Sequence, residues 1–477
     1  MRDAIALVSL TALLVAAGAG FVRAIGLPFR GPWLASSLGL APVVGVLSCS
    51  LVVALGAIVG VPISIYVVGL TAAAFIALAW RRAPMPRSSL GSLAPREQTG
   101  GARAVEVVLL CVLAAFAVRL IGLLSVVPVS SWDGWAIWAA RARALYAAGD
   151  VWSPAFQDPS YAPQHLEYPI LFPTLEALSL NAIGRYDAAM LHVLPGVLFL
   201  AVALAVWALL RLAIAPWLAA LSAVAIVGVD PLVENLRHNY ADSLTALVAS
   251  LGLLCLTLWV LHDASTLLVL AGLFFASAAL LKNEGLMFSF VAIAAAALAC
   301  PAARRSPRAL LWVGGAVLVA VAPWQVFIRL NGLPSSRDLS FSSLADPSYA
   351  VDHWGRIGQA SDALLDALVQ GWALPVTAGL IALVAAAASR RHELVVLFVG
   401  WTTLGFAGLV LTYYLATGDV NWLIAASVDR VVATLALGMA VIAPVLASEA
   451  WHARRANAAP AAARVQRRVP NAVSADS

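Results

Sequence analysis

The chain has 477 residues, of which 62% are hydrophobic and 11% are charged, and its formal net charge is +5. A soluble fold of this length cannot hide so much apolar surface, whereas a chain embedded in lipid can leave it exposed. The apolar runs have the length of membrane-spanning helices and lack the alternation of barrel strands, so we predict an all-α polytopic integral membrane protein.

Apolar runs of this kind recur along the whole chain, and each is predicted to be a transmembrane helix. There are about thirteen of them, at 4–22, 35–58, 62–80, 104–128, 188–210, 213–229, 243–261, 265–281, 286–300, 309–328, 374–389, 394–414 and 430–449. The first lacks a basic leader and a small-residue cleavage site, which favours a first span over a cleaved signal peptide. The cysteines are expected to be packing residues, since all fall within or at the ends of these runs: Cys49, Cys111, Cys255 and Cys300.

The basic residues predict the orientation of the chain in the membrane. If the spans alternate in direction, one face receives 18 of the 29 basic residues and the opposite face receives 18 of the 24 acids. We assign the basic face to the cytoplasm, which puts the N-terminus outside and the C-terminus inside. The Ala-, Val-, Leu- and Arg-rich composition favours a bacterial source, and hence the inner (plasma) membrane as the location.

The stretch "SWDGWAIWAARARAL", Ser131 to Leu145, opens the longest predicted outer segment. On a helix from Gly134, one stripe carries Trp135, Trp138, Ala142, Leu145 and Tyr146, with Arg141 and Arg143 on its flanks. This pattern predicts a helix in the membrane interface whose arginines reach water or phosphate. Asp133 precedes the helix. It is either a helix cap or a catalytic carboxylate at the boundary between lipid and water.

Two further features extend this pattern. The span before it carries the pair Arg119-Leu120, and "HLEYPILFPTLEAL" follows with Glu167, Tyr168 and Pro169. In order and spacing, 104–300 resembles the membrane glycosyltransferases of the GT-C superfamily, which include protein O-mannosyltransferases and aminoarabinose transferases. Many members have Asp-Glu where this chain has Asp133-Gly134. The aminoarabinose branch has a lysine where this chain has Tyr168, which argues against the same sugar.

The resemblance gives the chain its expected division. It implies a catalytic core over 104–300 with an outer loop at 129–187, preceded by extra transmembrane helices over 1–80 and followed by a C-terminal transmembrane region over 301–449 with an outer loop at 329–373. Composition and the distribution of basic residues predict a cytoplasmic linker over 81–103 and a disordered cytoplasmic tail over 450–477.

The resemblance also implies a polyprenyl-phosphate sugar as donor, with a lipid, glycan or protein as acceptor and membrane lipid around the site. An acceptor hydroxyl needs a base, for which Asp133 is the candidate, with Glu167 as the second acid. A phosphate leaving group needs cations more than a proton donor, and the candidates are Lys282, Arg430 and Arg119. A single base attacking in line would invert the anomeric centre. Lys282 could instead close a helix, and Arg430 could be an ordinary snorkelling arginine.

Other candidates surround these residues in the sequence. Asp242, in "RHNYADSL", matches an acid common at that place in relatives, although it could also be a helix cap. The remaining candidates for substrate binding are Tyr168, His165, Tyr240, Glu284 and Trp135. Because no spacing of acids and histidines resembles a metal set, we expect no metal and no cofactor. Nothing indicates nucleic acid as a partner.

Three other functions are compatible with the sequence. A lipid-linked glycan ligase or polymerase would use similar chemistry with a large late loop, for which 329–373 is available. A transporter or flippase would favour internal repeats and polar residues at the membrane midplane, and neither is visible. A non-catalytic scaffold would not need Asp133, Glu167 and Lys282.

Overall fold

The structure is a computed structural model that describes residues 1–81, 93, 100–158, 160–161, 165–333, 339 and 341–466, with the backbone alone for 341, 344, 350 and 456–466. Regular structure in these ranges is helical, apart from one antiparallel bridge between Leu339 and Ala416. The helices are α1 (Arg2–Ala24), α2 (Leu34–Ile58), α3 (Ile65–Arg81), α4 (Gly100–Leu124), α5 (Ala140–Ala148), α6 (Pro154–Gln157), α7 (Leu171–Ile183), α8 (Val193–Leu210), α9 (Pro216–Val227), α10 (Asp230–Arg237), α11 (Asp242–His262), α12 (Ser265–Leu281), α13 (Asn283–Ala303), α14 (Leu310–Leu330), α15 (Pro347–His353), α16 (Gly355–Gly371), α17 (Ala373–Ala388), α18 (His392–Tyr414) and α19 (Val420–Gln466). Short helical turns lie at Gly31–Trp33, Gly134–Ala139, Met190–His192, Pro307–Ala309 and Phe341–Ala345.

Each of the thirteen predicted apolar runs falls on a helix. In the described ranges nine helices are long and apolar enough to cross a membrane, or eleven if two bent pairs each count as one span. The pair α9 and α10 is bent by 50°, and the pair α16 and α17 by 96°. Helices α3 and α12 have 17 residues each. At about 1.5 Å per residue they are a little shorter than a hydrocarbon core of about 30 Å. The all-helical membrane architecture is thus confirmed, and the count of thirteen spans is not.

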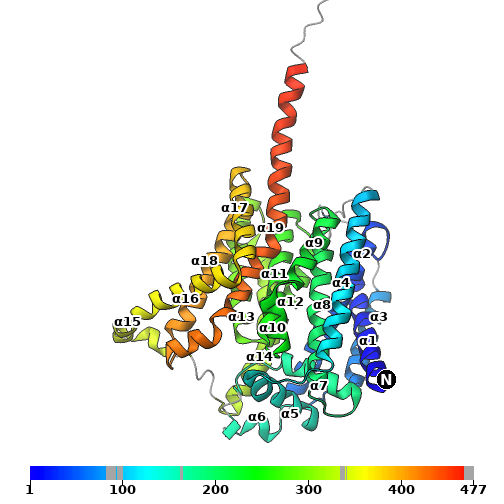
Figure 1. Cartoon of the computed structure of the whole chain (residues 1–477), viewed down its shortest axis with the longest axis vertical. Coiled ribbons are helices and arrows are strands. Elements are labelled where there is room, and N and C mark those ends of the chain that lie inside the picture. Colours follow the sequence, from blue (N-terminus) through cyan, green and yellow to red (C-terminus); the bar gives the residue numbers. More distant parts are fainter. Residues whose placement is uncertain are drawn as a thin grey trace, which may run out of the picture.

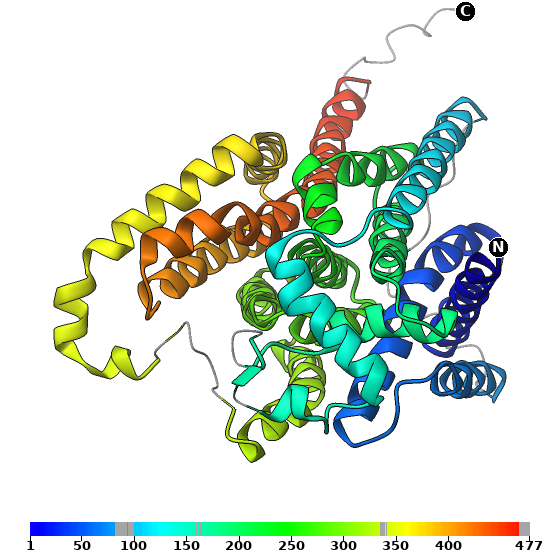
Figure 2. The same ribbon diagram turned by 60° about the horizontal axis from the view of Figure 1, so that its bottom comes forward.

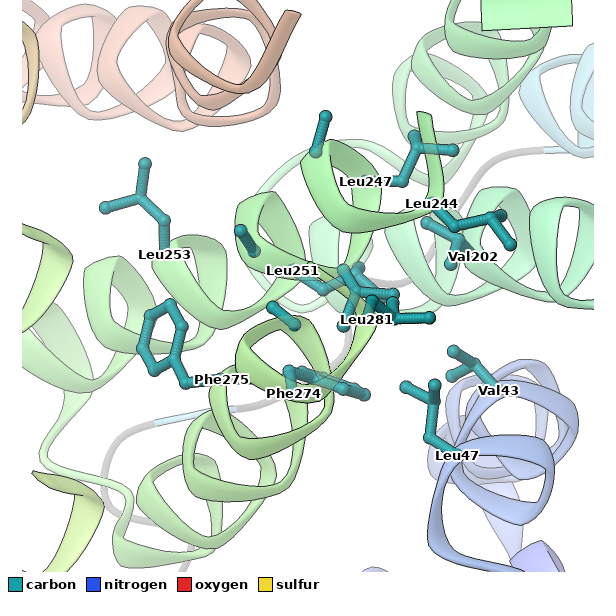
Figure 3. Packing of buried hydrophobic residues seen from close by; sticks show 14 of the residues in the cluster. Val43, Leu47, Val202, Leu244, Leu247, Leu251, Leu253, Phe274, Phe275 and Leu281 are labelled. Carbon is teal, nitrogen blue, oxygen red and sulfur yellow. The ribbon is translucent and has the colours of Figure 1, made fainter. Parts of the chain in front are cut away.

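Helix α11 lies at the centre of the bundle and packs against α8, α12, α13 and α19. Figure 3 shows its leucines interleaving with Phe274 and Phe275 of α12, while Val43 and Leu47 of α2 and Val202 of α8 close the same core. Close packing replaces the hydrophobic effect as the source of helix association in lipid. Because α2 contributes to this central core, the first three helices are part of the bundle and not an appended unit.

One end of the bundle carries a layer of short helices. Helices α5, α6 and α7 lie across the lower end in Figure 1, close to the N-terminus, and Figure 2 brings this end forward. An ion pair of 2.7 Å between Arg185 and Asp3 joins the layer to α1. The predicted outer loop 129–187 is therefore a packed layer, although residues 159 and 162–164 of it lie outside the described residues.

Helix α19 leaves the opposite end of the bundle (Figure 1). Its backbone stays helical to Gln466, so the tail predicted to be disordered from 450 is helical over its first part. Alanine and arginine, which dominate this stretch, are strong helix formers. The last predicted residues, 467–477, lie outside the described residues, as do 82–92 and 94–99 of the predicted linker and 334–338 and 340 of the loop 329–373.

Candidate functional site

Five charged side chains meet where helices end next to the α5–α7 layer. Arg430 of α19 contacts Asp133 at 2.9 Å between Nη1 and Oδ2, and Asp242 at 3.9 Å. Lys282 contacts Asp242 at 2.8 Å and Glu284 at 2.9 Å. These five residues, here called the ionic cluster, come from four separate parts of the chain. All were candidates from the sequence, and the structure brings them together.

Burial changes across the ionic cluster. The side chains of Asp242 and Lys282 are buried, whereas those of Glu284 and Asp133 are 26% and 32% exposed. The cluster therefore has a dry inner part and a wet outer part that contains Asp133. Burial alone would lower the pKa of Lys282, but the carboxylates of Asp242 and Glu284 outweigh it and raise that pKa, so the ammonium stays charged.

Local backbone geometry aims these side chains. Lys282 is an extended residue between α12 and α13, and the two helices approach so closely that a Cβ on Gly285 would overlap the carbonyl of Ala278. The tight turn directs the lysine towards Asp242. On α19, the guanidinium of Arg430 also donates to the carbonyl of Ala426 at 2.9 Å and lies 4.4 Å from the ring centre of Tyr240.

The two acids do not serve as helix caps. Neither the helix that Asp133 precedes nor α11, which begins at Asp242, has a side-chain hydrogen bond at its cap. Both carboxylates contact cations instead. The simple capping alternative is therefore wrong for both residues, as is the alternative that Arg430 only snorkels, because its guanidinium is engaged by Asp133.

The turn after Asp133 is pressed against the connection between α10 and α11. A Cβ on Gly134 would overlap the carbonyl oxygen of His238, so only glycine fits at this position. The Ser131 hydroxyl donates to the same carbonyl at 2.5 Å and accepts from the Gly134 amide at 3.2 Å. An acid after Asp133, as in many members of the resembled family, could not occupy this space without a shift of the backbone.

A second group of candidates lies in the α5–α7 layer. The His165 ring lies 3.2 Å from the Glu167 carboxylate and stacks on Tyr168, with ring centres 4.6 Å apart. Tyr168 stacks in turn on Trp138, and its phenol helps to raise the pKa of Lys282. Glu167 is 3% exposed and faces His165. The second acid of the ionic cluster is thus Asp242, and Glu167 belongs to the neighbouring aromatic group.

The environment of Arg141 differs from the one predicted for it on an interfacial helix. Its side chain is buried and donates to the carbonyls of Tyr168 at 2.5 Å and Pro169 at 3.4 Å, so it does not extend into solvent as predicted. Burial lowers the pKa of Arg141 to about 10, against the carboxylates that raise it, so it remains charged at neutral pH. The helix opens with a π-helical turn over Gly134–Ala139. The wider turn shifts the side chains, and Trp135, predicted to share a stripe with the buried Trp138, is 49% exposed.

Arg119 lies outside the site. It was expected to face protein and pair with an acid or a phosphate, but it is exposed on α4 and has no ion pair within the described ranges. Helix α4 packs against α8 and α9 only along one side. Because this span is apolar all round, its residue pattern does not indicate which face turns inward.

The structure contains two cavities of note. One, of about 10 Å³, adjoins the ionic cluster and is lined by Asp242, Thr245, Lys282, Glu284, Arg430, Val431 and Thr434. The other, of about 470 Å³, lies at the far ends of α11 and α13. Two of the three arginines that line it contact acids: Arg305 contacts Asp263 at 3.3 Å, and Arg391 contacts Glu393 at 3.4 Å and also Glu449. The small cavity has room for about one water molecule, so it marks a crevice beside the charged groups and not a preformed substrate pocket.

Comparisons with protein-family models, with curated proteins and with solved structures found no match. Within the described ranges, no three His, Cys, Asp or Glu side chains are arranged to hold a metal ion. The fold and the site define a polytopic helical membrane protein with a partly buried ionic cluster at one end of its bundle.

Proposed function

We propose that this chain is an integral membrane glycosyltransferase that moves a sugar from a polyprenyl-phosphate donor to a cell-envelope acceptor at the outer face of the plasma membrane. The observation that carries the proposal is the ionic cluster, in which a partly exposed carboxylate contacts an arginine beside a buried lysine. A donor with a lipid tail and a polar head requires such a site at the end of a bundle.

In this mechanism Asp133 is the general base. The acceptor hydroxyl gives its proton to Asp133, and its oxygen forms a bond to C1 of the sugar. The bond between C1 and the donor phosphate breaks, and its electron pair stays with the phosphate, which leaves as polyprenyl phosphate. Attack in line from the opposite side of the sugar inverts the anomeric centre.

Arg430 and Lys282 take the donor phosphate. Fixed cations stabilise the negative charge that collects on the phosphate as the bond breaks, without a proton donor. In the structure Arg430 is occupied by Asp133, at 2.9 Å. The incoming phosphate displaces this carboxylate, and the displaced carboxylate becomes available to the acceptor. Asp242 holds Lys282 in place throughout, because both are buried and in direct contact.

The aromatic group beside the cluster provides the surface for the sugar or the acceptor. His165 stacks on Tyr168, and Tyr240 lies against Arg430. Flat rings of this kind offer an apolar face together with polar edges, as a sugar ring requires. We assign substrate contacts to His165, Tyr168 and Tyr240. Glu167 holds the His165 ring in place.

Two alternatives are less well supported. A transporter or flippase would carry polar groups near the membrane midplane, whereas this cluster lies where α11 and α13 begin. A ligase or polymerase would use the late loop, but Arg356 there donates to the carbonyl of Ala416 at 2.5 Å. His353 stacks on Tyr349 in the same segment. Arg356 is thus occupied by the segment that follows α18, and His353 by a residue of its own loop.

A transfer assay on purified protein in lipid tests the proposal. A panel of polyprenyl-phosphate sugars is offered with envelope extract, and wild type is compared with Asp133→Asn. The matched control is Asp187→Asn, because Asp187 also contacts an arginine, at 2.8 Å, but outside the cluster. We expect transfer by wild type and the control, and none by Asp133→Asn. Equal transfer by all three proteins would remove Asp133 as the base, and no transfer by any would favour the transporter.

A further inference from the structure

The connection between α10 and α11 touches both halves of the ionic cluster. On one side the carbonyl of His238 accepts from Ser131, next to the turn that carries Asp133. On the other side Tyr240 lies against Arg430, and Asp242 contacts Lys282. A segment of five residues therefore sets how far the candidate base lies from the candidate cations.

Asn239 is the central residue of this connection. Its side chain is 1% exposed, and its backbone has a φ of 61°, in the left-handed region. Asparagine tolerates this conformation better than most residues, although glycine adopts it without strain. The amide Nδ2 donates to Glu176 Oε1 at 2.6 Å and points to the carbonyl of Gly134 at 3.4 Å. Gly134 directly follows Asp133, so Asn239 contacts the backbone that carries the candidate base.

Glu176 lies beneath Asn239 in α7 and is fully buried. Burial raises the pKa of Glu176 well above its usual range, against the opposing effects of Asn239 and Arg141. Its contact with Asn239 requires an acceptor oxygen, which Oε1 supplies. A glutamine in its place offers the same oxygen in the same shape.

We propose that Asn239 is a positioning residue, oriented by Glu176, that holds the turn carrying Asp133 at the correct distance from Arg430. The inference rests on the proposed function for its catalytic consequence. Two observations carry it: the hydrogen bonds of the Asn239 amide and the close approach of Gly134 to His238. Small errors in the placement of a reacting group are costly, since a displacement of about 1 Å can reduce a rate about 100-fold.

The test uses a substitution that removes the side chain without straining the backbone. Asn239→Gly keeps the left-handed conformation, and Arg390→Gly is the matched control, because Arg390 has a φ of 58° at the end of α17 and lies far from the cluster. Glu176→Ala removes the acceptor, and Glu176→Gln preserves it. All four variants of the full chain are compared in lipid nanodiscs by melting temperature, by amide hydrogen exchange over 134–139 and by transfer.

We expect Asn239→Gly and Glu176→Ala to exchange faster over 134–139 and to lose about 100-fold in kcat, with little change in the KM for the donor. Glu176→Gln and Arg390→Gly should match wild type both in amide exchange over 134–139 and in kcat. The rescue by glutamine separates positioning from a general loss of packing, which would affect both Glu176 variants.

The exchange measurement needs no substrate, so the inference and the proposed function can fail separately. Normal exchange over 134–139 in both Asn239→Gly and Glu176→Ala would overturn the inference, whatever the activity. Faster exchange together with wild-type transfer would also overturn it, since the turn would then not need to be held. If wild type transfers no sugar while Asn239→Gly exchanges faster, the proposed function fails and the anchoring of the turn stands.

Discussion

Replacing Asp133 with Asn should strengthen the binding of polyprenyl phosphate while it abolishes transfer. In the structure the Asp133 carboxylate occupies Arg430, the cation assigned to the phosphate. A neutral amide at this position competes less strongly for the guanidinium and does not repel the phosphate. A catalytic residue whose loss improves substrate binding is an unusual expectation, and it follows from this one contact.

The size of the effect follows from the exposure of the pair. Asp133 is 32% exposed and Arg430 18%, so water screens much of their attraction. An ion pair of this kind contributes about 1 kcal/mol, which corresponds to about a fivefold change in affinity. We expect polyprenyl phosphate to bind Asp133→Asn about fivefold more tightly than wild type, and the difference should shrink as salt is added.

The assay is titration of polyprenyl phosphate into protein in nanodiscs, with Asp187→Asn as the control for loss of an acid from an arginine pair. The control should bind as wild type does. Equal or weaker binding by Asp133→Asn would refute the reasoning, because it would mean that the carboxylate and the phosphate do not compete for Arg430. A melting curve that matches wild type is needed first, so that altered folding is not mistaken for altered affinity.

Three further predictions concern single contacts. Lys282→Met should lower the free energy of unfolding by about 3 kcal/mol, since it leaves the buried Asp242 without its cation. Adding Asp242→Asn should restore much of the melting temperature, and no recovery in the double variant would contradict the ion pair between Lys282 and Asp242. Arg119→Gln should keep transfer within about twofold of wild type, because an exposed side chain outside the cluster is replaced, and a large loss would return Arg119 to the site. Gly45→Val should lower the melting temperature by an amount equivalent to about 2 kcal/mol, because the valine side chain would overlap the carbonyl of Leu14 where α1 crosses α2. The kcat should not change, and an unaltered melting curve would contradict this close crossing.

Much of the ionic cluster could be predicted from the sequence because charge is rare in this chain. Asp242, Lys282 and Arg430 each stand at or near an end of an apolar run, on the face that the basic residues leave to the acids. Alternating the spans puts all three at one end of the bundle. The contacts among them, and the pairing of Arg430 with Asp133, need the three-dimensional arrangement of α11, α13 and α19.

Some residues have a position or a role that the sequence did not predict, and the reason is the same for each of them. Arg119 lies in a span that is apolar all round, so no periodicity shows which face turns inward. Arg141 follows a π-helical turn, which the regular spacing of an α-helix does not reproduce. Glu176 belongs to α7, and its role depends on Asn239, which is 63 residues away in the chain. Residue spacing relates neighbours along one element, whereas each of these side chains depends on a contact with another element.

The charges of the ionic cluster bear on the order in which substrates bind. Asp133, Asp242 and Glu284 are three acids, and Lys282 and Arg430 are two cations, so the cluster already has more negative than positive groups. A phosphate cannot be added to the dry inner part unless a carboxylate moves away. Asp133 is the most exposed of the acids, so its displacement into water costs least. The donor should therefore bind first and free the base, and the acceptor should bind second. A wild-type protein that binds acceptor equally well with and without donor phosphate would contradict this order.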